Sequence, residues 1–254
     1  LRAADEAFGE EWLLQRFGSA LSEDYFYLPE IELPSKRKQS TIPVARLDNM
    51  KYYHPYMWQR KMTKEIVDKF QIGYDESKQM ISFPVWDDQG KLVMITYRSV
   101  KDKRFYIDKD AEKPVYLLNF IKSEKISRVY VCESQINALT LWSWGYPAIA
   151  LIGTGSASQY DILNKSGITN YILAFDGDEA GDKAAIRFRK NIRDDVFISQ
   201  KVIPRRKDVN DLSKEEFARL VENYSVFARV SPEHKLKIVN ALMQATCDLY
   251  VWVP

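Results

Sequence analysis

Acidic side chains that follow short apolar runs are the residues of this chain best suited to chemistry. The five mostly apolar residues Tyr171–Phe175 are followed at once by Asp176, Gly177 and Asp178. Two carboxylates two residues apart, on a turn loosened by glycine, can point at one place. They can hold a hard divalent cation, which prefers oxygen ligands. A lone Asp-Gly-Asp turn is more often a solvated loop than a metal site, so its interpretation depends on the surrounding sequence.

Two more acids stand in the same relation to apolar runs. Glu133 ends the run 128–133, and Asp208 follows the run 196–203. The runs are apolar on both faces, as strands of a parallel sheet covered by helices must be. We expect strands 128–132, 147–152, 171–175 and 196–203, separated by helices 135–144, 157–165 and 179–193. Ligands of such sheets bind beyond the carboxyl ends of the strands. The sequence therefore predicts that all four acids meet at one edge.

This pattern resembles the Toprim domain, a metal-binding fold of bacterial primases, type IA and II topoisomerases and some nucleases. The family has a glutamate after its first strand, a DxD after its third and an acidic loop after its fourth. The corresponding residues here are Glu133, Asp176, Asp178 and Asp208. The runs FDGDEAGDKAA (175–185) and KDVNDL (207–212) are similar to DnaG-type primases, those of phages above all. Cellular primases often carry aspartate where this chain has Asn210, so the site loses a charge, and Asp211 is an alternative ligand.

The resemblance implies an α/β fold with two parts. One is a Toprim domain of about four parallel strands flanked by helices, and the other is a smaller α+β amino-terminal subdomain. We divide the chain into an acidic helix with a Pro-rich basic linker (1–50), the α+β subdomain (51–125), the Toprim domain (126–212) and a helical segment (213–254). Within the last, 226–239 is similar to a short segment of P-type ATPases, which we interpret as coincidence or a splice.

The α+β subdomain is expected to carry the nucleic-acid groove. Short helices at 52–61 and 63–70 precede a hairpin with strands 80–86 and 91–100. In the primase family, an arginine ending this hairpin and a basic residue after it line the groove for template and nucleotide. The resemblance gives these roles to Arg98 and Arg104, and extends them to Lys101, Lys103 and Lys113. Aromatic residues interleave with these cations, which suits stacking on single-stranded bases. An ordinary basic hairpin surface is the alternative.

Two other turns were considered as phosphate sites. The run Gly153–Ser156 lacks the G-x-x-x-x-G-K-[ST] pattern, so we expect no helicase motor, and Ser156 is explained as a helix N-cap. Arg206 and Lys207 directly precede Asp208 and can meet a triphosphate, so they join the expected nucleotide-binding residues.

Composition limits the choice of function. With 37 Lys and Arg against 35 Asp and Glu, the net charge of +2 means that any nucleic-acid surface must be local. No apolar run approaches the roughly 18–20 residues that span a bilayer. Two cysteines and two histidines cannot form a Cys-rich zinc ribbon. We therefore expect the zinc module usual in primases to be absent or upstream of Leu1, in a chain that is an excised fragment.

The resemblance implies a primase catalytic core that makes short RNA primers on single-stranded DNA. Two Mg²⁺ or Mn²⁺ ions would be held by Glu133, Asp176, Asp178, Asp208 and Asn210, with Glu133 either a ligand or the general base. The implied partners are single-stranded DNA, ribonucleoside triphosphates and a replicative helicase, with no membrane. We expect a monomer in the bacterial or phage-infected cytoplasm. A Toprim nuclease or topoisomerase, a non-catalytic binding module, and an unrelated doubly wound protein remain alternatives.

Overall fold

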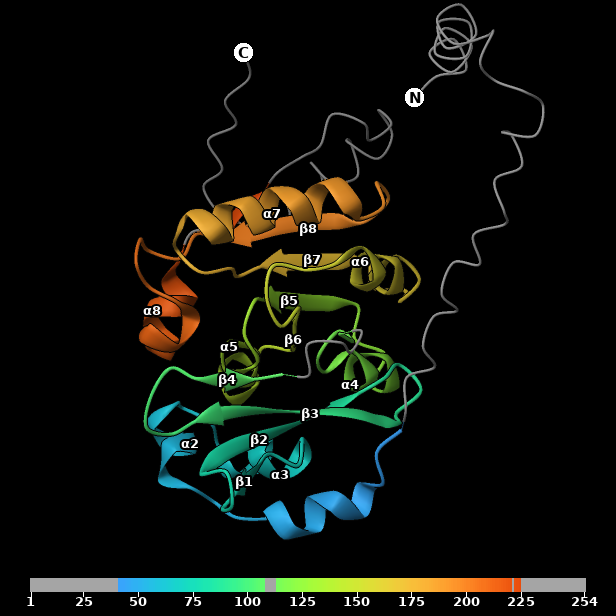
Figure 1. The fold of residues 1–254 in the computed structure, drawn as a ribbon. Coiled ribbons are helices and arrows are strands. Elements are labelled where there is room, and N and C mark those ends of the chain that lie inside the picture. Colours follow the sequence, from blue (N-terminus) through green and yellow to red (C-terminus); the bar gives the residue numbers. More distant parts are fainter. Residues whose placement is uncertain (1–40, 108–112, 221, 225–254) are drawn as a thin grey trace, which may run out of the picture. The chain divides into compact units, whose positions relative to one another are not determined.

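Two β-sheets of different kinds organise the described part of the chain (Figure 1). This computed structural model describes residues 41–107, 113–220 and 222–224, all within one of its two structural units, Gln39–Pro254. Most of the predicted acidic helix and linker, and the tail after residue 224, lie outside the described residues. Two helices, α4 (Leu118–Ser123) and α5 (Gln135–Ser143), lie between the sheets (Figure 1).

The first sheet is antiparallel, in the order β1-β2-β3-β4. Its strands are β1 (Gly73–Asp75), β2 (Met80–Trp86), β3 (Leu92–Ser99) and β4 (Phe105–Tyr106). The predicted hairpin is confirmed, because β2 and β3 pair with Phe83 opposite Thr96. The Asp87 carboxylate holds the turn by accepting hydrogen bonds from the Gln89 and Lys91 amides.

Short helices cover this sheet. The 3₁₀ helix η2 (Val44–Met50) packs its Leu47 and Met50 against one face, beside Leu92 and Ile95. Helices α2 (Pro55–Gln59) and α3 (Lys64–Lys69) add their buried side chains to the main core on the other face. Both helices are shorter than predicted, whereas α4 and η2 were not predicted at all.

The second sheet has the order β6-β5-β7-β8-β9. Its parallel strands are β5 (Arg128–Cys132), β6 (Ala148–Ala150), β7 (Asn170–Leu173) and β8 (Phe197–Lys201). The helices α6 (Ala157–Asn164) and α7 (Glu179–Asn191) connect them. The predicted four-stranded parallel sheet flanked by helices is confirmed. Ser156 caps α6 as predicted, and Ser134 caps α5 in the same way; each accepts a hydrogen bond from the amide three residues on.

The end of the described chain differs from the prediction. Ser213 and Glu216 form the capping box of α8 (Lys214–Arg219), but the helical segment predicted from residue 213 onward stops there. The chain turns extended at Leu220, whose carbonyl accepts a hydrogen bond from Lys201 Nζ at 2.8 Å. Glu222–Tyr224 then form β9, which pairs antiparallel with β8. Pairing with a sheet edge outweighed the local helical pattern.

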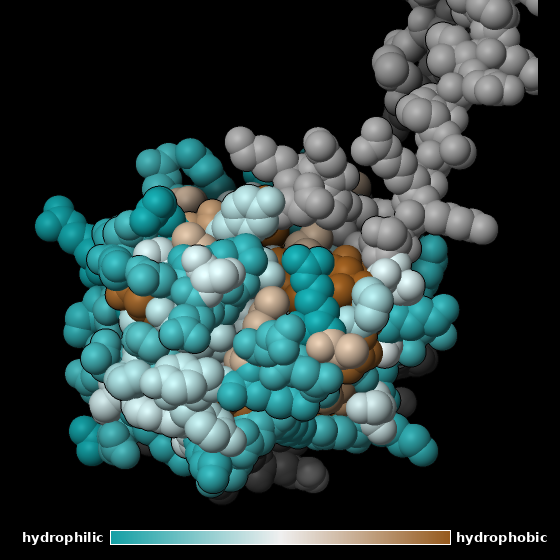
Figure 2. All heavy atoms as spheres, turned by 60° about the horizontal axis from the view of Figure 1, so that its bottom comes forward, coloured by the Kyte–Doolittle hydropathy of each residue, from teal (hydrophilic) through white to brown (hydrophobic). Residues whose placement is uncertain are grey.

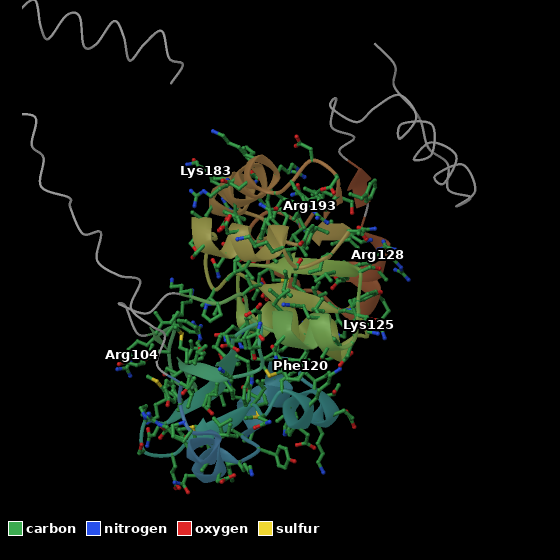
Figure 3. The ribbon with its side chains drawn as sticks, turned by 90° about the vertical axis from the view of Figure 1, so that its right-hand side faces the viewer. Arg104, Phe120, Lys125, Arg128, Lys183 and Arg193 are labelled. Atoms are coloured by element: carbon green, nitrogen blue, oxygen red, sulfur yellow. The ribbon has the colours of Figure 1, made fainter. Side chains whose placement is uncertain are left out.

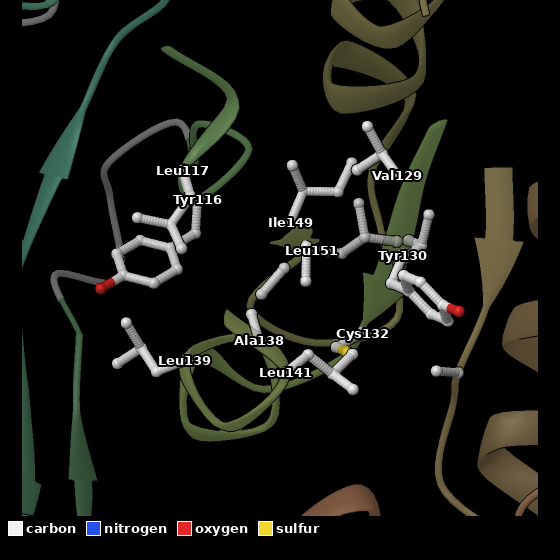
Figure 4. Packing of buried hydrophobic residues seen from close by; sticks show 14 of the residues in the cluster. Tyr116, Leu117, Val129, Tyr130, Cys132, Ala138, Leu139, Leu141, Ile149 and Leu151 are labelled. Carbon is white, nitrogen blue, oxygen red and sulfur yellow. The ribbon is translucent and has the colours of Figure 1, made fainter. Parts of the chain in front are cut away.

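Helix α5 is the centre of the core. Nearly all its side chains are buried, because it faces one sheet on each side. Ala138 and Leu141 lie against the parallel strands beside Cys132, while Leu139 and Tyr116 point toward the antiparallel sheet (Figure 4). A helix enclosed in this way needs no polar face. The few polar residues that it does bury, Gln135 and Asn137 among them, are therefore candidates for function.

The face in Figure 2 is largely hydrophilic, with hydrophobic residues in small patches. In the described ranges, no helix combines the length and apolar character needed to cross a membrane.

Candidate metal centre and nucleic-acid interface

The predicted acids lie at the carboxyl ends of adjacent strands. Strands β5 and β7 pair in parallel with Val131 opposite Leu173, and β8 pairs with the other side of β7. Glu133 follows β5 directly, Asp176 and Asp178 follow β7, and Asp208 lies on the loop after β8. The Asp176 amide donates a 3.4 Å hydrogen bond to Glu133 Oε1, which links the first two acidic turns.

These carboxylates are close enough to repel one another. Burial and the nearby charges of Glu133, Asp208, Asp178 and Asp211 raise the pKa of Asp176 to about 7. Burial and the charge of Asp178 raise the pKa of Glu133, and burial and the charge of Asp211 raise that of Asp208. Neighbouring buried carboxylates disfavour each other's ionised form, and a bound cation relieves this repulsion.

Asn137 of α5 orients the central acid. Its amide Nδ2 donates to Asp176 Oδ1 at 3.0 Å, and its side chain is only 1% exposed. Its own Oδ1 is buried without a hydrogen-bond partner. Asn137 is a site residue that was not predicted from the sequence. The available signal was a polar amide in the first turn of a mostly apolar helix, four residues after Glu133.

Gly177 allows two loops to meet at the site. Its amide donates to Lys207 O, and its carbonyl accepts from the Arg206 amide, both at 2.8 Å. A Cβ at this position would lie 2.1 Å from Pro204 O, so only glycine permits the approach. The pair of hydrogen bonds brings the loop that carries Asp208 to the Asp-Gly-Asp turn.

Two of the acids are held by helix-capping bonds. Asp178 Oδ1 accepts from the Gly181 amide at 2.8 Å and caps α7. Asp208 opens the 3₁₀ helix η3 (Val209–Asp211) and forms a reciprocal capping box with Asp211. These bonds fix both carboxylates in place before any ligand arrives.

Asn210 has a different setting from the acids. Its amide Nδ2 donates to Arg60 O and to Thr140 Oγ1, both at 2.9 Å, and its Oδ1 accepts from Arg60 Nη1 at 3.2 Å. The side chain is 6% exposed. The structure thus ties the Asn210 amide to Arg60 and Thr140, and a role for Asn210 as a metal ligand stays a prediction.

The acids fit an ion that tolerates an open site. Across residues 41–107, 113–220 and 222–224, no three His, Cys, Asp or Glu side chains form a ready-made metal cluster. Mg²⁺ usually keeps several waters and takes one or two carboxylates together with substrate phosphates. Glu133, Asp176, Asp178 and Asp208 can supply such an incomplete shell.

The predicted cations fall into separate groups. Arg98 Nη1 donates to Lys103 O at 2.9 Å, and Arg104 Nε pairs with Asp102 at 2.8 Å, so these residues share the turn between β3 and β4. Lys101 belongs to the same turn and donates to Gln79 Oε1. Arg104 is 74% exposed and projects from the protein (Figure 3). The rings of Phe105 and Tyr106 are exposed beside it, 43% and 57% respectively.

The remaining cations lie closer to the acidic edge. Lys113 Nζ donates to Ile152 O at 3.5 Å, on the loop after β6. Arg206 and Lys207 are exposed on the loop that hydrogen-bonds to Gly177, next to Asp176 and Asp178. The structure thus brings Arg206 and Lys207 to the acids, whereas Arg98, Lys101, Lys103 and Arg104 form a second basic surface on the hairpin.

Comparison with known proteins agrees with this architecture. Residues 130–213 match the family model described as Toprim-like. A DNA primase of Clostridium acetobutylicum is 28% identical over 172 residues, covering 62% of this chain and 29% of that protein. A solved DnaG primase catalytic domain bound to ssDNA has a TM-score of 0.55 at 17% identity, covering 81% of this chain and 78% of that one. The chain spans about a third of the length of the curated primases it matches.

A different similarity concerns a short segment. Over 38 residues the chain is 60% identical to the calcium-transporting ATPase of Bacillus subtilis, which is 15% of this chain and 4% of that protein. The fold assignment rests on the long matches to primases and not on this short one. Residues 130–213 form a Toprim-like domain, and the chain around them has its homologues and structural neighbours among DnaG-type DNA primases and their catalytic cores.

Proposed function

We propose that this chain is the catalytic core of a DNA primase, which joins ribonucleotides into short RNA primers on a single-stranded DNA template. The observation that carries the proposal is the cluster of Glu133, Asp176, Asp178 and Asp208 at one strand edge, where burial and neighbouring acids raise the pKa of Glu133, Asp176 and Asp208. Primase homologues and the fold of primase catalytic cores support it.

Two divalent ions, Mg²⁺ or Mn²⁺, would stabilise the attacking and leaving oxygens of an in-line displacement when bound. Asp176, Asp178 and Asp208 would bind them, and Glu133 would serve as a ligand or as the base that accepts the 3′-hydroxyl proton. Asn137 would keep one oxygen of Asp176 occupied, which leaves the other for the ion. Catalysis of this kind rests on positioning and charge neutralisation.

The two groups of cations would bind different substrates. Arg206 and Lys207 adjoin the acidic turn and would receive the triphosphate of the incoming ribonucleotide. Arg98, Lys101, Lys103 and Arg104 would bind template phosphates, while Phe105 and Tyr106 would offer ring faces to the bases. Lys113, beside the loop after β6, would approach either strand. A replicative helicase as partner and the cytoplasm as location remain part of this proposal.

Primer synthesis tests the proposal. Wild type, Asp176→Ala, Asp178→Ala and Glu133→Gln would be incubated with single-stranded DNA, labelled ribonucleotides and either Mg²⁺ or Mn²⁺. We expect short labelled oligoribonucleotides from wild type with either metal, and their loss in each variant. The control is Asp161→Asn, which changes an exposed acid on α6 that is ion-paired with Lys165. It should retain full activity.

The same assay separates the alternatives. Template cleavage without synthesis would identify a Toprim nuclease. Binding of single-stranded DNA with neither synthesis nor cleavage would identify a non-catalytic module. Synthesis that survives Asp176→Ala would contradict the proposed metal site while leaving the primase activity.

A further inference from the structure

The two residues after α2, Arg60 and Lys61, hydrogen-bond to the loop that follows Asp208. Lys61 Nζ donates to Leu212 O at 2.7 Å and also to Asn210 O. Arg60 and Asn210 form a reciprocal pair, with Arg60 Nη1 donating to Asn210 Oδ1 and Asn210 Nδ2 donating to Arg60 O. Thr140 of α5 joins this pair through Oγ1, which accepts from Asn210 Nδ2 and donates to Arg60 O.

The backbone of Lys61 is unusual for a lysine. Its φ is +61°, a left-handed conformation that favours glycine. The amides of Lys61 and Met62 donate to Trp58 O and Met57 O, which is the common helix-ending motif with glycine at this position. A lysine here accepts backbone strain. Its half-buried ammonium donates hydrogen bonds to two carbonyls of the acidic loop, and a glycine could not make these bonds.

The loop that these bonds hold carries Asp208. Asp208 opens η3, Asn210 lies within it, and Leu212 follows it. Lys61 therefore fixes the middle and the end of the turn that begins at the acid. Gly177 fixes the other end, through its hydrogen bonds to Arg206 and Lys207. Between these anchors, Asp208 has little freedom to leave the strand edge.

We propose that Lys61, assisted by Arg60, is a positioning residue for the acidic cluster. It holds residues 208–212 so that Asp208 stays beside Asp176, and this sets how tightly the edge binds a divalent cation. The inference deepens the proposed function and rests on it for the cation, but the clamp itself is a property of the metal-free protein.

The chain offers a matched control. Lys125 stands at the same position after α4, with φ +54° and the same two hydrogen bonds, from its own amide to Lys122 O and from Ile126 to Ile121 O. Its side chain is exposed, on the side of the protein away from Arg104 (Figure 3). Lys61→Gly and Lys125→Gly relieve the same backbone strain, but only the first removes the ammonium from the loop.

Two measurements test the clamp. Hydrogen exchange in the metal-free protein follows the amides of Asp211 and Leu212, which are bonded within the loop to Asp208 O and Val209 O. Thermal unfolding over a Mn²⁺ titration gives the cation affinity. For Lys61→Gly we expect exchange at these amides to rise about tenfold and the Mn²⁺ affinity to fall about tenfold, with strand β7 unaffected. Lys125→Gly should match wild type in both. Lys61→Met, which keeps the apolar stem without donors, should repeat the result.

The outcomes of these measurements separate the clamp, the positioning role and the proposed function. Unchanged exchange in Lys61→Gly and Lys61→Met would overturn the clamp. Faster exchange with wild-type Mn²⁺ affinity would overturn the positioning role. Wild type that binds Mn²⁺ but makes no primers would remove the proposed function and leave this inference standing. Wild type that binds no Mn²⁺ would overturn both the positioning role of Lys61 and the proposed function.

Discussion

Asn137 and Asp176 are joined by a 3.0 Å hydrogen bond from a buried amide to the central carboxylate of the acidic edge. The two residues come from α5 and from the turn after β7, so the bond ties the helix between the sheets to the candidate metal site. It uses one oxygen of Asp176 and adds no charge. The bond therefore orients the acid without competing with a cation.

Removing the Asn137 amide should weaken catalysis more than folding. A hydrogen bond to a charged group contributes about 1.5–3 kcal/mol, so Asn137→Ala should lower primer synthesis roughly ten- to a hundredfold. Asn137→Asp should lower it further at low Mg²⁺, because it adds another negative charge, and recover partly at high Mg²⁺. Rates measured over a Mg²⁺ titration test this. Asn164→Ala, which removes an amide bonded to Asn191 O at the carboxyl end of α7, is the control. Equal losses in both variants would contradict the orienting role.

Asp176 should make the metal-free protein less stable as pH rises. Its folded pKa of about 7 lies above the unfolded value of about 3.9, so the folded state binds the proton more tightly. The stability that this proton provides is complete below about pH 4 and is lost as pH rises to about 7. The Asp176→Asn variant cannot ionise at this position, so it does not lose this stability as pH rises. At pH 8 with a chelator, it should exceed wild type in unfolding free energy by about 2 kcal/mol, half of the roughly 4 kcal/mol that the full shift would give.

Denaturant unfolding of both proteins from pH 4 to pH 8 measures this difference. Parallel stability profiles for wild type and Asp176→Asn would show that the carboxylate is not strained by its neighbours. Added Mg²⁺ should remove the advantage of the variant at pH 8, because a cation that binds only the folded wild type stabilises it by mass action.

Gly177→Ala should separate the two loops at the site. Its Cβ would meet Pro204 O at 2.1 Å, and neither backbone can yield without breaking the bonds to Arg206 and Lys207. We expect a loss of about 2–4 kcal/mol in unfolding free energy and no detectable primer synthesis. Gly90→Ala meets nothing within 4 Å and adds only the strain of φ +76°, about 1 kcal/mol. A Gly177 variant no worse than this control would contradict the close approach.

The hairpin cations should bind the template through its phosphates. Each phosphate that a side chain neutralises contributes about 0.7 to the slope of log affinity against log salt for single strands. Arg104→Ala should therefore weaken binding of any single-stranded sequence about equally and lower that slope by about 0.7. Fluorescence anisotropy over a salt series measures both. Lys165 is an exposed cation at the carboxyl end of α6, and Lys165→Ala should leave the slope unchanged.

Much of this fold could be predicted from the sequence because its signals are local. Strand β2 occurs at its predicted residues, and Ser156 begins α6 through the expected N-cap bond. The position of Glu133 near Asp176 also followed, since carboxyl ends of neighbouring parallel strands share an edge.

Other features depend on contacts between distant residues. Strand β9 forms because the edge of β8 is available, which the capping box at Ser213 could not reveal. The bonds of the Asn210 amide to Arg60 and Thr140 join residues that are 150 and 70 positions apart in the chain, so no local pattern indicated them. Lys61 carried no signal at all, since neither its left-handed backbone nor its bond to Leu212 O leaves a local pattern.

The most direct test of the central claim is primer synthesis by wild type and Asp176→Ala on single-stranded DNA, with and without Mg²⁺. The account predicts short RNA products only from wild type and only with the metal. Products that persist in Asp176→Ala would contradict the metal site, and a wild type that makes none with either Mg²⁺ or Mn²⁺ would contradict the proposed primase activity.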